Sequence, residues 1–193
     1  GLTEALQALG ENEKGKVVKE DIVAENLKNA EAGDADAQWT LAYAYATGKG
    51  VTKNLDESFK WMELAANQGH ADAQYNLGCA YRYWYADPNH TEAIKWYELA
   101  ANQGHADAQY NLGCAYMEGE GVTQNYTEAI KWYELAANQG HADAQQNLEY
   151  AKLGPDTALG RVAFNAICLL GRDSDFQDDV IGIAVEVLKS HGI

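Results

Sequence analysis

A long phrase that the chain repeats almost unchanged constrains its fold more than any other feature. It reads KWYELAANQGHADAQYNLGCAY at Lys95–Tyr116, differs by one residue at Lys60–Tyr81, and fades at Lys131–Lys152. Its Ala-x-x-Gly signature starts at positions 30, 66, 101 and 137. A period between about 20 and 50 residues is typical of a stacked array. One such repeat cannot bury its apolar faces alone, whereas stacked repeats can.

Each repeat is predicted to form two helices, of which the first runs over Ala71–Tyr81 in the second copy. Ala73 and Leu77 lie four residues apart and therefore share one apolar face of this helix. Gly78, and Gly113 at the same position of the next copy, leave room for a neighbouring helix to approach closely. We therefore expect two packed helices to meet at these glycines.

The second helix of each repeat is framed by two end signals. It begins with Asn-x-x-Glu, which is close to a capping box, and it ends at the glycine of NQG, as expected for a residue with positive φ after a helix. The apolar face at helical spacing includes one tryptophan per repeat. We expect these side chains to be buried against the first helix; they are Trp61, Trp96 and Trp132.

The repeats divide the chain into three parts. Residues 1–29 match the pattern poorly and are interpreted as a degenerate N-terminal helical cap. In the fourth copy Glu149 replaces the small glycine and Gly154-Pro155 ends the helix, so the array stops there. Residues 155–193 are predicted to form a helical hairpin that serves either as a cap or as a docking element. The repeats occupy 30–153, as 30–65, 66–100, 101–136 and a partial copy at 137–153.

The net charge of the chain indicates which kinds of partner it is expected to bind. The formal net charge is −15 and the pI is about 4.6. Such a field repels phosphate backbones, so nucleic-acid binding is not expected, and a partner with a basic or amphipathic surface is favoured. No apolar run approaches the roughly 18–20 residues that a membrane span needs, so no span is predicted.

The cysteines favour a reducing compartment. There are three, Cys79, Cys114 and Cys168, and the first two occupy the same position in successive repeats. Packed helices lie about 8–10 Å apart, beyond the roughly 7 Å limit of a disulfide, so all three are interpreted as reduced thiols. A cytoplasmic location is therefore favoured. The periplasm or secretion stays open, because a leader could have been removed before Gly1.

The pattern A-x-x-G-x-A-x-A-Q-x-x-L-G-x-x-Y-x-x-G-x-G-V-x-x-N-x-x-E-A-x-x-W-Y resembles the Sel-1-like repeat family, a relative of the tetratricopeptide repeats, over about Ala30–Leu153. The resemblance implies an all-α fold, built as a right-handed superhelical solenoid of antiparallel helix pairs. It also implies a non-enzymatic adaptor or scaffold for protein–protein interaction, as used in signalling, bacterial assemblies and host interaction.

Carried over from the tetratricopeptide register, the resemblance places the second, fifth, ninth and twelfth positions of each first helix in a concave groove. The groove would combine aromatic and acidic side chains, so the predicted partner is a protein or peptide with basic groups and apolar anchors. The alternative is that the aromatic rings only pack between adjacent helices. The predicted groove residues are Asp36, Trp39, Tyr43, Ala46, Asp72, Tyr75, Cys79, Arg82, Asp107, Tyr110, Cys114, Met117, Asp143, Gln146 and Tyr150.

The second repeat departs from the others between its two helices. RYWYADPN stands where the other copies have ATGKGVTKN and MEGEGVTQN, so both glycines of the usual turn are missing. Three adjacent aromatic residues on a connector cannot all face one core, so at least one should be exposed. Tyr83, Trp84 and Tyr85, with Arg82 beside them, are a candidate hot-spot patch for a partner. The alternative is that these rings fold back over the neighbouring turn.

No catalytic residue, metal site or cofactor is predicted. A histidine follows the NQG turn in three copies, but the aspartate two residues later has the wrong spacing to share a helix face with it. His70, His105 and His141 are therefore interpreted as structural turn residues. The sequence contains no G-x-S-x-G, H-E-x-x-H or C-x-x-C motif.

Several alternatives to an adaptor stay open. The chain could be an inhibitor or immunity protein that holds one toxin or enzyme in its groove. It could be a β-lactam-binding, hydrolase-like relative of the cysteine-rich proteins of Helicobacter, although the cysteine pairs of those repeats and any nucleophile–base pair are missing. It could form a homodimer through the hairpin at 155–193. The near identity of the copies fits either recent duplication or consensus design.

Overall fold

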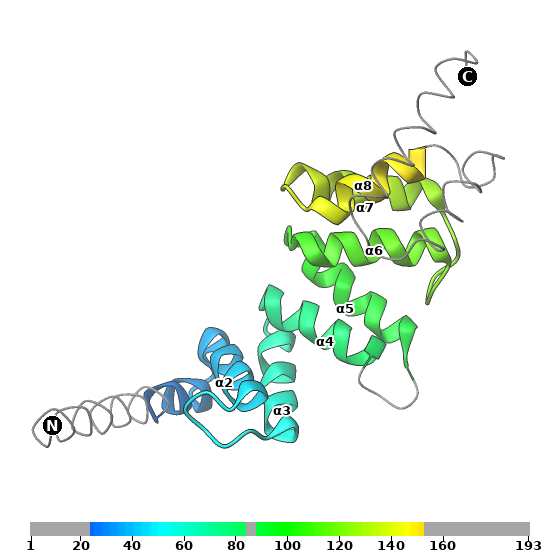
Figure 1. Cartoon of the computed structure of the whole chain (residues 1–193). Helices are drawn as coiled ribbons and strands as arrows, with labels where there is room; N and C mark the ends of the chain where they lie inside the picture. The colour runs from blue at the N-terminus through cyan, green and yellow to red at the C-terminus, as the bar shows by residue number, and fades with distance from the viewer. Residues whose placement is uncertain (1–23, 84–87, 153–193) are drawn as a thin grey trace, which may run out of the picture. The chain divides into compact units, whose positions relative to one another are not determined.

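The computed structural model of the chain describes residues 24–83 and 88–152, and in these ranges it contains helices and turns but no strand (Figure 1). The predicted all-α repeat fold is therefore confirmed. Residues 24–31 are helical and precede the labelled helices. These are α2 (Ala35–Thr47), α3 (Leu55–Asn67), α4 (Ala71–Tyr83), α5 (His90–Asn102), α6 (Ala106–Glu118), α7 (Tyr126–Asn138) and α8 (Ala142–Lys152).

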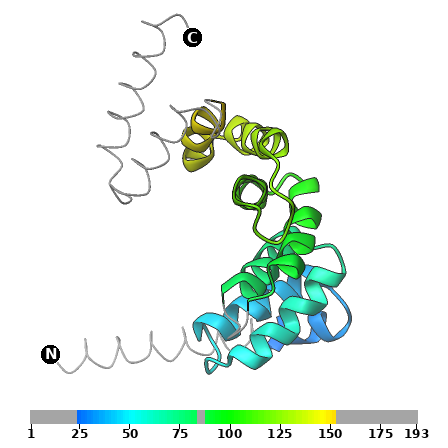
Figure 2. The same ribbon diagram turned by 90° about the vertical axis from the view of Figure 1, so that its right-hand side faces the viewer.

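The helices pack as hairpins inside two compact units, residues 1–105 and 106–193. In the first unit α2 packs on α3 and α4 on α5, with further contacts between α3 and α4. In the second unit α6 packs on α7, and α8 lies against α7 (Figure 2). We call α2, α4, α6 and α8 the A helices, and α3, α5 and α7 the B helices. None of the helices in the described ranges is long and apolar enough to cross a bilayer.

The predicted end signals of the B helices are confirmed. The Asn54 side chain accepts hydrogen bonds from the backbone N–H groups of Asp56 and Glu57, and Asn125 caps α7 in the same way. Asn89 caps α5 by accepting from the N–H of Glu92. The NQG glycine lies just beyond each B helix with a φ between 87° and 95°. The A helices α4 and α6 run two residues beyond the predicted Tyr81 and Tyr116.

A tyrosine of each later B helix lies flat against a glycine of its A helix. A Cβ atom on Gly78 would lie 2.7 Å from Cδ1 of Tyr97, and one on Gly113 would lie 2.5 Å from Cδ1 of Tyr133. Both rings are almost fully buried. The close approach predicted at these glycines is thus confirmed, and the approaching group is a phenol ring.

The first repeat has a different pair of residues at the glycine and tyrosine positions. Ala42 stands where the later repeats have glycine, and Met62 stands where they have tyrosine; both are buried. A methionine side chain is slim and flexible, so it leaves space for the methyl group of the alanine. The two positions therefore change together along the chain.

The expectation that all three tryptophans are buried is wrong for two of them. Trp132 is buried, but Trp61 and Trp96 are only partly buried. The position after each tryptophan occupies the core instead, because neighbours on a helix point about 100° apart. Trp61 still packs on the A helix of its own repeat, beside Ala37 and Leu41 of α2.

Three predictions fall on residues outside the described ranges. They are the cap over residues 1–23, the hairpin at 155–193 with its Cys168, and the placement of Trp84 and Tyr85. Of the predicted N-terminal cap, the helical stretch 24–31 is described, and its Ala30 is buried among residues of α2.

Candidate functional site

The predicted groove residues lie along one side of each A helix, which we call the A face of its unit. The four aspartates Asp36, Asp72, Asp107 and Asp143 are exposed there. Three aromatic rings, Trp39, Tyr75 and Tyr110, are half-buried, as are Ala46, Cys79, Arg82, Cys114 and Gln146. Tyr43 stands out, because 52% of its surface is exposed.

Two predicted groove residues belong to the core and not to a surface. Met117 and Tyr150 are 8% and 6% exposed and pack in one cluster with Ala129 and Tyr133 of α7. Met117 lies ten residues after Asp107, which is roughly 80° round the helix from it at about 100° per residue. Tyr150 extends from α8 into the same cluster, where its apolar ring is better placed than in water. Neither side chain is available to a partner.

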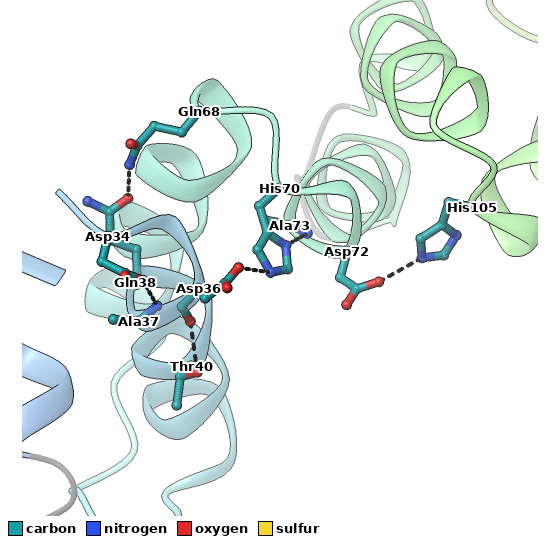
Figure 3. A network of polar contacts seen from close by, with 10 residues as sticks. All are labelled: Asp34, Asp36, Ala37, Gln38, Thr40, Gln68, His70, Asp72, Ala73 and His105. Atoms are coloured by element: carbon teal, nitrogen blue, oxygen red, sulfur yellow. Dashed lines mark hydrogen bonds and ion pairs between the residues drawn. The ribbon is translucent and has the colours of Figure 1, made fainter. Parts of the chain in front are cut away.

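Each turn histidine joins its own repeat to the A helix before it. Nδ1 of His70 accepts a hydrogen bond from the backbone N–H of Ala73 at 3.3 Å, which caps α4, and Nε2 lies 3.5 Å from Oδ1 of Asp36 in α2 (Figure 3). His105 reaches Asp72 in the same way at 3.2 Å. The histidines are structural turn residues, as predicted, and they also bind the preceding repeat, which was not predicted.

The same histidine rings stack on the aromatic residues of the A face. The ring centroids of Tyr75 and His105 are 4.6 Å apart with nearly parallel planes, and His70 lies 5.6 Å from Trp39. In the second unit His141 repeats the arrangement with Tyr110 at 4.6 Å, with Asp107 at 3.2 Å, and with the N–H of Ala144 at 3.2 Å. One side of each of these aromatic residues is thus used to hold the next repeat.

Buried glutamines form a second connection that sequence reasoning missed. The Gln38 amide donates to the carbonyl of Ala30 at 3.0 Å, and its oxygen accepts from the Gln68 amide at 2.7 Å. Gln74 repeats both bonds with Ala66 and Gln103. The carbonyls of Ala30 and Ala66 also accept the backbone N–H groups of Gly33 and Gly69, so each glutamine amide supplies a second donor to a carbonyl at a helix end. The sequence feature that could have predicted these bonds is the glutamine present in every A helix and in every NQG turn.

The A face also holds a hydrogen-bonded group of thiols and phenols. Tyr97 donates to Sγ of Cys79 and Tyr133 donates to Sγ of Cys114, each at 3.4 Å. Neither cysteine forms a disulfide. In the second unit the Asn147 amide lies 3.4 Å from the Tyr110 hydroxyl and 3.5 Å from the Tyr133 hydroxyl. The cysteines therefore help to fix the tyrosine hydroxyls.

Burial raises the pKa of Tyr97, Tyr110 and Tyr133 above the ordinary range, and the neighbouring cysteine sulfur raises it further. An unfolded tyrosine loses its proton near pH 10, whereas the folded protein holds these protons to higher pH. Their contribution to stability is therefore complete below about pH 10 and is lost as the pH rises above it. We expect the urea midpoint to fall steeply above about pH 10, and to fall less steeply for Tyr133→Phe. An equal slope for both proteins would contradict this assignment.

The charges of the A and B helices are arranged differently. Each B helix carries a lysine that pairs with its own glutamate: Lys60 with Glu57 at 2.6 Å, and likewise in α5 and α7. The helices α2 and α6 contain no lysine or arginine, and α4 has only Arg82 in its last turn. Among the described residues the ion pairs of Asp36, Asp72 and Asp107 are with histidine alone.

The candidate hot-spot patch is described only at its start. Tyr83 is 62% exposed, and the Arg82 guanidinium lies 5.0 Å from the centre of its ring. This is a cation–π distance. The exposure fits the expectation that at least one aromatic residue of the patch faces solvent, while Trp84 and Tyr85 lie outside the described residues.

No group of three or more potential metal ligands occurs within residues 24–83 and 88–152. For His70 and His141, Nδ1 is already engaged in capping an A helix and Nε2 in binding the aspartate of the preceding repeat.

Comparison with known proteins gives a family and three similar structures. A family model described as the Sel1 repeat matches residues 35–70, 71–105 and 106–141. A Sel1 repeat protein from Oxalobacter formigenes is 38% identical with a TM-score of 0.63, over 65% of this chain and 96% of that one. A protective antigen of uropathogenic Escherichia coli with an SLR fold is 39% identical with a TM-score of 0.63. That match covers 67% of this chain and 28% of the antigen.

The third structure is the cysteine-rich protein B of Helicobacter pylori, with 22% identity and a TM-score of 0.51 over 67% of this chain and 93% of that one. At this identity the likeness concerns the fold alone. No match was found among curated proteins.

Proposed function

Because the chain belongs to the Sel1 repeat family, whose members generally act as protein-interaction modules, we propose that it binds a partner protein or peptide on the A faces of its repeats. The observation that carries the proposal is Tyr43. This large ring is 52% exposed on α2, at the position where the later repeats have cysteines that accept from buried tyrosines. Exposed tyrosines are frequent anchors at protein interfaces.

The exposed leucines of the B helices form the alternative surface for binding a partner. Leu64, Leu99 and Leu135 occupy the same position in α3, α5 and α7 and are 40–48% exposed. They stand beside helix-internal Glu–Lys pairs that already neutralise each other. The A faces, in contrast, combine exposed aromatic surface with carboxylates that pair with no lysine or arginine of the described residues. This contrast favours the A faces, because charge and aromatic anchors together give specificity.

The proposal includes no catalysis. The recurrent histidines, which would be the first candidates for a general base, cap α4 and α8 through Nδ1 and bind an aspartate through Nε2. The cysteine sulfurs accept hydrogen bonds from tyrosine hydroxyls, whose pKa is raised by burial. The histidines thus join one repeat to the next, and the cysteines hold the two helices of one repeat together. These structural roles support a binding function for the side chains that remain exposed on the A faces.

Two matched substitutions test the proposal. In quantitative pull-downs from extracts of the source cells, Tyr43→Ala is expected to reduce recovery of the specific partner at least about tenfold, since a buried aromatic anchor contributes about 2 kcal/mol or more. Leu64→Ala on α3 removes a similarly exposed side chain and is expected to leave recovery unchanged. A loss with Leu64→Ala and not with Tyr43→Ala would place the partner on the B helices instead.

A further inference from the structure

The first repeat differs from the two later ones at two neighbouring positions of the A helix and at one position of the B helix that packs on it. The later repeats have glycine, cysteine and tyrosine there, whereas the first has alanine, tyrosine and methionine. The positions are 42, 43 and 62 in the first repeat, 78, 79 and 97 in the second, and 113, 114 and 133 in the third. Packing at the glycine position explains the exchange of Ala42 with Met62. The tyrosine next to Ala42 requires a separate reason.

In the later repeats the cysteine accepts a hydrogen bond from the buried tyrosine. The Tyr97 hydroxyl lies 3.4 Å from Sγ of Cys79, and the Tyr133 hydroxyl lies 3.4 Å from Sγ of Cys114. Both phenol rings are at most 2% exposed, and both cysteines are half-buried. A buried hydroxyl group needs a hydrogen-bonding partner, and the sulfur atom supplies it. The cysteine side chain is therefore engaged by the core of its own repeat.

A tyrosine at the cysteine position could not accept this hydrogen bond. Sγ is the first atom beyond Cβ, and in tyrosine that place is taken by a ring carbon, which is not an acceptor of ordinary hydrogen bonds. In the same geometry the ring of Tyr43 would lie against the hydroxyl of any tyrosine at position 62 and separate it from water. A buried hydroxyl without a partner lowers stability. A tyrosine on the A helix and a tyrosine in the core are therefore alternatives within one repeat.

The core of the first repeat has methionine at this position and therefore no hydroxyl group. Met62 is 3% exposed and lies in one cluster with Ala42. Its thioether donates no hydrogen bond and is only a weak acceptor, so it is buried without needing a partner. The core then requires no acceptor at position 43, which is free to carry a large ring. Tyr43 is 52% exposed there.

From these observations we infer that Met62 is a positioning residue for partner binding, because it allows the first repeat to display an aromatic anchor at Tyr43 where the later repeats hold a cysteine in their own core. The inference rests on the proposed function, in which Tyr43 contacts the partner. It also places this anchor in the first repeat alone among the three. A buried residue of the B helix thus determines whether the A helix of its repeat has a structural or a binding side chain at this position.

The first test rebuilds the core of the later repeats inside the first repeat. Ala42→Gly with Met62→Tyr introduces a phenol hydroxyl beneath Tyr43, and Ala42→Gly with Met62→Phe introduces the same ring without the hydroxyl. The hydroxyl can reach water only if the Tyr43 ring turns aside, so its cost lowers either the stability in urea or the recovery of the partner. Multiplied together, the two losses should be at least about fivefold relative to the phenylalanine variant. No loss in either measurement would overturn the inference.

The second test transfers the three residues of the first repeat to the second. Gly78→Ala with Cys79→Tyr and Tyr97→Met should give a chain with an additional exposed tyrosine, which tetranitromethane nitrates about as fast as it nitrates Tyr43 in the wild-type chain. Mass spectrometry of the digested chain locates the nitrated residues. Cys79→Tyr alone is the control: it removes the acceptor of the Tyr97 hydroxyl, so its urea midpoint should fall below that of the triple variant. A protected new tyrosine in the triple variant, or equal midpoints, would contradict the role given to Met62.

A third variant separates this inference from the proposed function. Adding Tyr43→Cys to Ala42→Gly with Met62→Tyr restores an acceptor for the hydroxyl, so this variant should regain stability in urea and still fail to recover the partner. Loss of recovery with Tyr43→Ala, together with no difference between the tyrosine and phenylalanine variants at position 62, would retain Tyr43 as the anchor and reject the role of Met62. Unchanged recovery with Tyr43→Ala would reject the proposed function, and with it the positioning role, whatever the urea measurements show.

Discussion

Replacing Tyr97 by alanine is expected to lower the free energy of unfolding by about 3–5 kcal/mol, the range for removing a large buried aromatic side chain. The ring is completely buried on α5, it packs against Gly78 of α4, and its hydroxyl donates to Cys79. Its removal leaves a cavity between two helices that backbone relaxation cannot close. Urea unfolding followed by circular dichroism measures the change.

A matched variant separates the ring from its hydroxyl. Tyr97→Phe keeps the packing and removes only the hydrogen bond to the Cys79 sulfur, so we expect a loss of about 1 kcal/mol or less. If Tyr97→Ala cost no more than Tyr97→Phe, the ring would not be filling the core as the structure has it. Trp96→Ala is expected to cost less than Tyr97→Ala, because Trp96 is only partly buried.

The second large effect is expected from adding a single methyl group. A Cβ atom on Gly113 would lie 2.5 Å from both Cδ1 and Cε1 of Tyr133, and the ring is nearly fully buried and cannot move aside freely. Gly113→Ala is therefore expected to cost about 1–3 kcal/mol by overpacking, although alanine favours a helix by about 1 kcal/mol relative to glycine. The measurement is again urea unfolding.

The first repeat supplies the compensating change. Ala42 and Met62 occupy the equivalent positions there and are both buried, so Tyr133→Met should restore at least half of the stability lost in Gly113→Ala. Each single variant and the double variant form a thermodynamic cycle. Strict additivity of the two changes would show that residues 113 and 133 are not in contact, contrary to the structure.

The sequence was sufficient for features that depend on a single repeat. The period, the helix pairs, the asparagine caps and the positive-φ glycines follow from local rules, since each involves residues a few positions apart. It was also sufficient for the close approach at Gly78. The expectation that Trp61 and Trp96 are buried was wrong, because adjacent apolar residues on a helix both fit an apolar stripe. The paired exchange of Ala42 with Met62 was the signal that identifies the core position.

The side-chain contacts that join one repeat to the next could not be predicted from the helical periodicity of the sequence. His70 was compared with the aspartate two residues after it, whereas its partner Asp36 lies a full repeat earlier. Which residues meet across repeats depends on how two helices cross, and periodicity within one helix does not contain that angle. Met117 was placed on the groove by the tetratricopeptide register, although its position roughly 80° round α6 from Asp107 carries it into the core.

The histidine junction has a consequence for how such a chain changes length over evolution. Every period contains both the aspartate with its aromatic neighbour and the histidine that binds such a pair. A tandem duplication of the coding sequence for residues 71–105 would therefore create a new boundary between repeats made of the same three side chains as the old ones. No second mutation is needed to make the inserted copy fit. A gene of this kind can gain or lose a repeat in one recombination event, and near-identical neighbouring copies are the sequence pattern that such an event leaves.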